Sequence, residues 1–153
     1  MNDKNSLPIL IVALVAGFLA VLVFHQPMLI LLKNIGLAAD NLTPYATNPT
    51  PPFGIPRVLS LALWGGVWGI LLAIAISGTQ GLAYWLSGLL LGAIVPSLVN
   101  WFIVLPLKDE PVGGGWQVPG VATALIVNGV WGIGTVLLFR LLARNLLSNN
   151  RRN

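Results

Sequence analysis

The sequence has no cysteine, a single histidine and only four acidic residues among its 153 positions. Without cysteine the chain has no disulfides, thiolate metal sites or cysteine nucleophiles. Charged residues make up 8% of the chain, whereas a soluble domain carries about 25% because its whole surface faces water. These shortages indicate that the main solvent, and the first partner, of this protein is a lipid bilayer.

Apolar residues are abundant and form long runs. They make up 56% of the chain, and the mean hydropathy is +0.86. The apolar runs cover residues 7–32, 56–77, 82–107 and 119–142. Each is as long as the roughly 20 residues that cross a bilayer as a helix. The predicted fold class is therefore an all-α membrane protein, a bundle of four transmembrane helices in one membrane domain, 1–153.

Prolines and connections divide these runs. Pro56 and Pro119 stand at helix starts, where a missing N–H costs nothing, whereas Pro96 lies inside the third run and predicts a kink. The link at 77–81 is very short, so we expect the second and third helices to be antiparallel neighbours. The loop at 33–55 is too rich in proline for a helix and predicts turns and extended segments over the membrane surface.

An internal repeat is visible in the sequence. The pentapeptide GVWGI occurs at 66–70 and again at 129–133, an offset that Pro56 and Pro119 share. In the first and third runs, residues 17–19 align with 88–90. We therefore predict two tandem helical hairpins, 7–77 and 82–142, followed by a basic polar tail at 143–153. Because each hairpin has two spans, both have the same orientation, as in a parallel repeat.

Basic residues predict the orientation. One side of the membrane would hold five of them, namely Lys4, Arg140, Arg144, Arg151 and Arg152, and the other side three, namely Lys33, Arg57 and Lys108. The side richer in Lys and Arg is cytoplasmic, so both termini are predicted to be cytoplasmic in a multi-pass protein of a bacterial inner membrane. The basic tail is interpreted as a topology signal, and no nucleic-acid partner is expected.

Small residues and tryptophans within the spans predict close helix packing. Glycines recur at four-residue spacing, which allows helix backbones to approach each other in lipid. An oligomer or partner interface is the alternative interpretation of these ridges. Trp68 and Trp131 each precede a glycine of the repeat and are expected to fill the space beside small neighbours. The predicted packing residues are Gly17, Gly65, Gly69, Gly88, Gly92, Trp68 and Trp131.

Polar side chains inside the spans are the candidate site. At 1.5 Å per residue, His25, Asn100 and Asn128 should lie roughly 10 to 14 Å from the same membrane face, with Gln26 beside them. Such a polar layer can be a structural hydrogen-bond cluster, part of a transport path, or, through His25, an axial ligand site for haem or a chlorophyll-type pigment. A hydrogen-bond cluster is the default interpretation.

Missing groups limit the function. No Asp or Glu lies in any span, so the membrane carboxylate of a proton-coupled pump is absent. There is no Ser/His/Asp set, no HExxH motif and no phosphate-binding loop. We expect no enzyme, cofactor or metal site. The leading hypothesis is an accessory, scaffold or assembly component of a membrane complex, with other membrane subunits or further copies as partners. The alternative is a small oligomeric channel or carrier.

Overall fold

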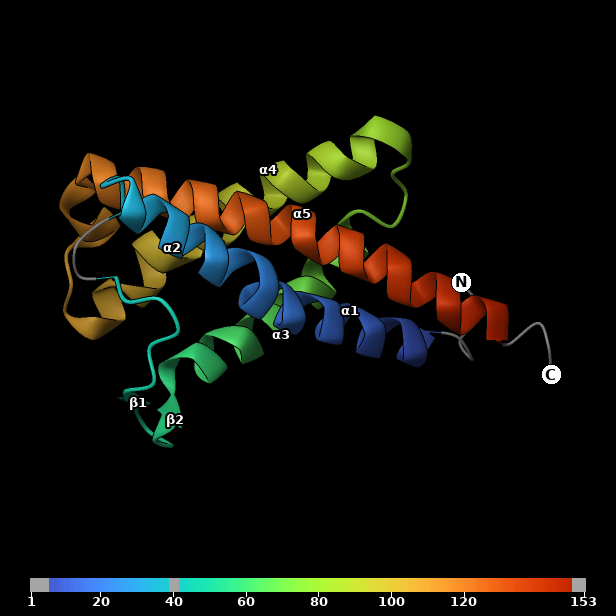
Figure 1. Ribbon diagram of the computed structural model, residues 1–153, viewed down its shortest axis with the longest axis horizontal. Coiled ribbons are helices and arrows are strands. Elements are labelled where there is room, and N and C mark those ends of the chain that lie inside the picture. The colour runs from blue at the N-terminus through green and yellow to red at the C-terminus, as the bar shows by residue number, and fades with distance from the viewer. Residues whose placement is uncertain (1–5, 39–41, 150–153) are drawn as a thin grey trace.

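The computed structural model describes residues 6–38 and 42–149, and these fold as four long helical segments joined by irregular loops (Figure 1). Lys4, Arg151 and Arg152, which entered the orientation argument, lie outside the described residues, as does the end of the basic tail. The described helices long and apolar enough to cross a membrane are Leu7–Asn34, Arg57–Ala75, Gly81–Lys108 and Val118–Arg144. The prediction of four spans is confirmed, and the chain is accordingly a multi-pass membrane protein.

Two of the four segments change helix type along their length. The first consists of α1 (Ser6–Ala20), the π-helical η2 (Val21–His25) and α2 (Gln26–Asn34). The third continues α4 (Gly81–Val99) into the π-helical η3 (Asn100–Val104) and a 3-10 turn, η4 (Pro106–Lys108). A π-helical segment holds one more residue per turn than an α-helix, so it changes which side chains share a face.

The other two segments are uninterrupted α-helices. The second is α3 (Arg57–Ala75) and the fourth is α5 (Val118–Asn149). Pro56 directly precedes α3, and Pro119 lies in the first turn of α5, where a residue without an N–H breaks no helical hydrogen bond. The two prolines therefore stand where the sequence predicted helix starts.

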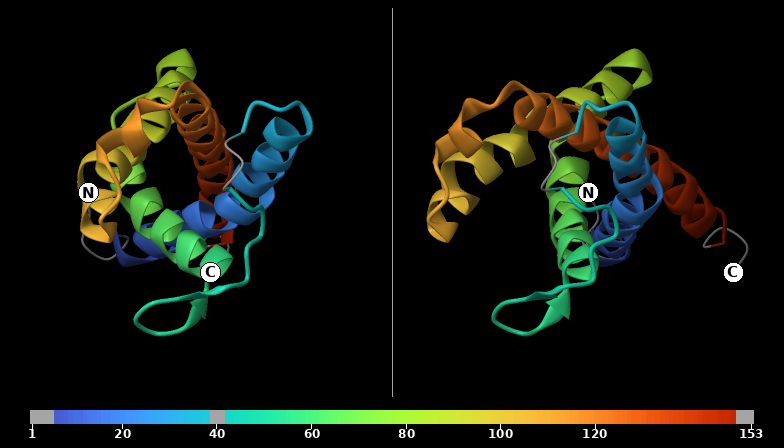
Figure 2. Two further views of the ribbon diagram at one scale, coloured as in Figure 1. Left: turned by 90° about the vertical axis from the view of Figure 1, so that its left-hand side faces the viewer. Right: turned by 60° about the vertical axis from the view of Figure 1, so that its left-hand side comes forward.

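The helices pack in an order that the short link does not reveal. Extensive contacts join α1 to α3, α4 to α5 and α1 to α5, whereas α3 and α4 make few contacts (Figures 1 and 2). The expectation that α3 and α4 would be packed neighbours is therefore wrong. The link at 76–80 makes α3 and α4 run in opposite directions but does not make them pack. The glycine face of α3 lies against α1, and that of α4 lies against α5.

Glycines allow a close crossing in each of the α1–α3 and α4–α5 pairs. At α1–α3, a Cβ added to Gly17 would lie 2.9 Å from the Cα of Gly69. At α4–α5, a Cβ added to Gly132 would lie 2.9 Å from the Cα of Gly92. Real Cβ atoms do not approach backbone so closely, so both crossings require glycine. Such close approach stabilises helix packing in lipid through van der Waals contacts.

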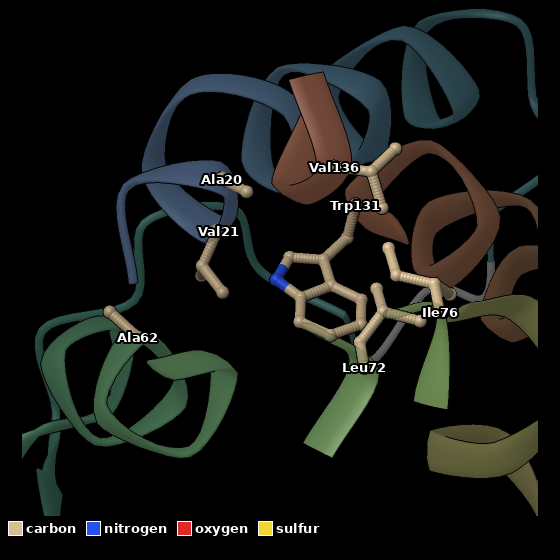
Figure 3. Close-up of a cluster of buried hydrophobic side chains, with 7 residues drawn as sticks. All are labelled: Ala20, Val21, Ala62, Leu72, Ile76, Trp131 and Val136. Atoms are coloured by element: carbon tan, nitrogen blue, oxygen red, sulfur yellow. The ribbon is translucent and has the colours of Figure 1, made fainter. Parts of the chain in front are cut away.

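Trp131 occupies the centre of the buried core (Figure 3). Its indole is 3% exposed and extends from α5 toward α1 and α3. Its Nε1–H donates a hydrogen bond to the carbonyl oxygen of Gly17 at 3.0 Å. The surrounding cluster comprises Ala20, Val21, Ala62, Leu72, Ile76 and Val136. One residue of α5 thus connects the two glycine-packed helix pairs.

The first loop is ordered where the structure describes it. It contains a short antiparallel pair, β1 (Pro49–Thr50) and β2 (Ile55–Pro56), which projects beyond the helices (Figure 1). Backbone hydrogen bonds from Arg57 N–H to Asn48 O at 3.0 Å and from Val58 N–H to Ala46 O at 2.9 Å connect the hairpin to the start of α3. The loop therefore has the turns and extended segments that its prolines predicted.

The second loop closes over the end of the third segment. It contains a 3-10 segment, η5 (Val112–Trp116), in which Gly113, Gly114 and Gly115 all have positive φ. The Trp116 ring packs 5.7 Å from the ring centroid of Trp101 and equally far from that of Phe102. Glycine adopts positive φ without strain, which lets this tight loop return Trp116 to the helix.

Candidate functional site: polar groups within the helices

Gln26 is the centre of the first polar group. Its side chain is 3% exposed, and its Oε1 accepts a hydrogen bond from the backbone N–H of Tyr45 at 2.6 Å. The Tyr45 hydroxyl donates to the carbonyl oxygen of Leu22 at 2.6 Å. Leu22 belongs to the π-helical η2, where the usual i to i+4 bonding of carbonyls is interrupted. Tyr45 therefore attaches the first loop to the helix at two points.

The Tyr45 contact determines how Gln26 faces His25. Because Oε1 accepts from the Tyr45 N–H, the Gln26 amide nitrogen points toward His25, and Nε2 lies 3.3 Å from His25 Nδ1. An amide nitrogen can only donate, so this contact is a hydrogen bond in the tautomer whose Nδ1 is the acceptor. Haem or pigment ligation by His25 stays a prediction from the sequence.

The second polar group lies between α4 and α5. Asn128 Nδ2 donates to Ser97 Oγ at 2.9 Å, and Ser97 Oγ donates to the carbonyl oxygen of Ala93 at 2.6 Å. Ser97 is fully buried. A buried hydroxyl costs free energy unless it is hydrogen-bonded, and here it is satisfied on both sides. This group joins two helices that also meet at Gly92 and Gly132.

The candidate residues therefore occupy two groups. His25 and Gln26 bond with the first loop, whereas Asn128 bonds with Ser97. Asn100 is half-buried at the start of η3, and its side chain has no hydrogen bond within the described residues. In that part of the chain, no hydrogen bond connects His25, Asn100 and Asn128. A common polar layer remains a prediction based on depth.

Sequence reasoning did not identify Tyr45 or Ser97. Tyr45 lies 19 residues beyond Gln26 in a loop, and no local pattern indicates such a contact. Ser97 offered a weak signal, because it directly follows Pro96 and lies three residues from Asn100 in the third run. A small hydroxyl in a membrane helix commonly bonds to its own backbone, which makes its pairing with Asn128 hard to predict.

The predicted packing residues lie at or beside the helix crossings. Gly17 meets Gly65 and Gly69 between α1 and α3, and Gly88 and Gly92 meet α5. Both tryptophans line an apolar crevice of about 210 Å³ between α3 and α4, but Trp131 is buried in the core and Trp68 is half-buried. The two tryptophans of the repeated pentapeptide therefore have different surroundings.

The chemistry available in the described residues is limited. Within residues 6–38 and 42–149, no three His, Cys, Asp or Glu side chains are grouped closely enough to hold a metal ion. The polar side chains of the two groups bond to each other or to nearby backbone. No family model matches this chain, and neither does any curated protein or solved structure.

Proposed function

We propose that this protein is a non-enzymatic accessory, scaffold or assembly component of a larger membrane complex. The observation that carries the proposal is the projecting hairpin of the first loop. Phe53, between β1 and β2, is 83% exposed. We infer that this apolar side chain, which its own core leaves uncovered at the tip of the hairpin, packs against a partner subunit.

The attachment of this loop supports the proposal. Tyr45 bonds to the helix at Gln26 and Leu22, and Lys33 Nζ donates to the Leu42 carbonyl at 2.8 Å. Holding a long loop in one conformation costs entropy, and the fold offsets that cost with these bonds. A loop ordered before binding loses less entropy when a partner binds. The hairpin is thus suited to recognition.

The local bonding of Gln26, Asn128 and Thr123 favours this role over transport. Gln26 bonds to Tyr45, and Asn128 bonds to Ser97. The Thr123 hydroxyl, also buried, donates to the Pro119 carbonyl at 2.6 Å. A channel or carrier instead needs polar groups that a solute can reach in succession. The alternative of an oligomeric channel around His25, Asn100 and Asn128 therefore has less support.

We also propose that the two hairpins are repeats of one ancestral unit, because equivalent glycines make equivalent contacts. A Cβ at Gly66 would lie 3.0 Å from the Leu14 carbonyl oxygen, and a Cβ at Gly129 would lie 3.1 Å from Leu89 Cδ1. Gly66 and Gly129, in the second helix of each hairpin, are 63 residues apart, and Leu14 and Leu89, in the first helix of each hairpin, are 75 residues apart. The contacts thus favour aligning Gly17 with Gly92, one helical turn beyond the alignment that residues 17–19 and 88–90 suggested.

A bacterial inner membrane with cytoplasmic termini is the setting that we propose. Arg140 and Arg144 are exposed near the C-terminal end of α5. Lys33, Arg57 and Lys108 lie at the opposite ends of the helices, beside the two larger loops. With Lys4, Arg151 and Arg152 added from the sequence, the side of the termini has five basic residues against three, which supports the cytoplasmic assignment. The projecting hairpin would then face the periplasm.

The test is gentle extraction of the tagged, full-length protein from its native membrane, followed by identification of the co-extracted proteins. We expect a partner in a fixed ratio. Phe53→Ser should remove that partner while leaving the helices intact, as circular dichroism would show. Leu82→Ser is the matched control, because Leu82 is 72% exposed at the opposite end of the helices. It should retain the partner.

Recovery of the protein alone under gentle extraction would contradict the accessory role. A partner that tolerates Phe53→Ser but is lost with Leu82→Ser would place the binding surface at the other end and refute the role of the hairpin. A homogeneous homo-oligomer without other subunits would instead favour the channel alternative.

A further inference from the structure

The crevice between α3 and α4 lies where two helices joined by a short link would be expected to touch. It measures about 210 Å³, and all its lining residues are apolar. Trp68 and Ala75 of α3 form one wall, Leu91 and Pro96 of α4 form the other, and Trp131 of α5 contributes a buried surface. The few contacts between α3 and α4 therefore coincide with a space that the protein itself leaves open.

This crevice opens toward lipid. Its lining residues Leu71, Leu91 and Val95 are 49%, 36% and 37% exposed, so they line the crevice and also face outward. All three lie in helices of membrane-spanning length. Water is scarce at this depth and would find no polar partners among the lining side chains. Only apolar groups are therefore suited to enter.

The size of the crevice distinguishes between the apolar groups that could enter. From Trp68 to Ala75 it extends along seven residues of α3, or about 10 Å. A partner helix about 10 Å across would need roughly 800 Å³ over that length. The space is about a quarter of that volume, yet it exceeds the roughly 150 Å³ cavity that is known to stay dry and bind benzene. A single flexible hydrocarbon chain matches these dimensions.

We propose that the crevice between α3 and α4 binds one acyl chain of a bilayer phospholipid. The chain would contact the face of Trp68 and reach the buried ring of Trp131. It would supply the packing that α3 and α4 do not provide to each other, and would thereby take the place of a direct helix contact. This site does not depend on the projecting hairpin or on any protein partner.

Photo-crosslinking in vesicles tests the proposal. The full-length protein would be reconstituted in phosphatidylcholine and phosphatidylglycerol containing a small fraction of phosphatidylcholine with a diazirine in its acyl chain. Adducts would be mapped by mass spectrometry. We expect adducts on Trp131, which is 3% exposed and out of reach of lipid that only surrounds the bundle. Adducts on the outward-facing Leu63 and Leu90 serve as the internal standard.

A pair of neighbouring substitutions controls for nonspecific labelling. Ala75→Phe fills the crevice and should lower the Trp131 adducts several-fold relative to those on Leu63. Ile74→Phe adds a ring at an adjacent position that does not line the crevice and is 57% exposed, so it should leave the ratio unchanged. Circular dichroism and gel filtration would check that both variants fold.

The proposal is overturned if the unmodified protein is labelled on Leu63 and Leu90 but not on Trp131, because a closed α3–α4 contact or a partner helix would then exclude the chain. This result does not require any variant to fold. Equal losses of Trp131 labelling in Ala75→Phe and Ile74→Phe would also overturn it.

Discussion

Trp131→Phe tests whether one indole connects the two helix pairs. The substitution removes the hydrogen bond from Nε1 to the Gly17 carbonyl, 3.0 Å long, and leaves a smaller ring in a position that is 3% exposed. Both the lost bond and the lost volume are buried. The variant should therefore be less stable, although its helices stay apolar enough to remain in the membrane.

The expected loss has two parts of similar size. A hydrogen bond between membrane helices contributes about 1 kcal/mol. Replacing an indole by a phenyl ring leaves roughly 40 Å³ unfilled, which at about 24 cal/mol per Å³ costs about 1 kcal/mol more. The free energy of unfolding should therefore fall by about 2 kcal/mol, if the neighbouring side chains relax only in part.

The measurement is reversible unfolding in detergent micelles by titration with sodium dodecyl sulfate, followed by circular dichroism. Trp68→Phe is the matched control, since Trp68 is the repeat counterpart, is half-buried and has no hydrogen-bond acceptor within the described residues. It should cost less than half as much as Trp131→Phe. Equal losses in the two variants, or no loss in Trp131→Phe, would refute the assignment of Trp131 as the connecting residue.

Two further predictions concern a helix crossing and the attached loop. Gly17→Ala should lower the free energy of unfolding by more than about 2 kcal/mol in the same titration, because the new Cβ would meet backbone of α3. Gly120→Ala is the control and should not destabilise, because nothing lies within 4 Å of its added Cβ. Equal losses in the two variants would contradict the argument. Gln26→Leu removes the acceptor for the Tyr45 N–H and should therefore speed chymotrypsin cleavage within residues 42–56. Gln80 is exposed, so Gln80→Leu is the control and should leave the cleavage rate unchanged. An unchanged rate in Gln26→Leu would show that this bond does not hold the loop.

The membrane spans could be predicted because the requirement behind them is local. A helix must remain apolar for about 20 residues to cross the hydrocarbon, and each span can be counted without knowing its neighbours. Helix starts at Pro56 and Pro119 followed from backbone chemistry of the same local kind. Glycine spacing likewise indicated close crossings, as seen between Gly17 and Gly69.

The candidate site was harder to predict because residue counting gives depth but not direction. His25 and Asn100 lie in π-helical segments, where the extra residue per turn changes the face on which later side chains lie. The depth argument therefore could not show whether His25, Asn100 and Asn128 face one another. Tyr45, which orients Gln26, comes from a loop whose path no periodicity predicts.

The sequence by itself determined the number, length and position of the spans, since these depend on matching apolar length to bilayer thickness. It did not determine which glycine face meets which helix, because a ridge of small residues allows close packing against any helix with a matching surface. Only the tertiary structure inserted Trp131 between α1 and α3, where it bonds to Gly17, and left Trp68 half-buried beside a crevice. Those outcomes depend on the total packing of four helices at once, which no single segment encodes.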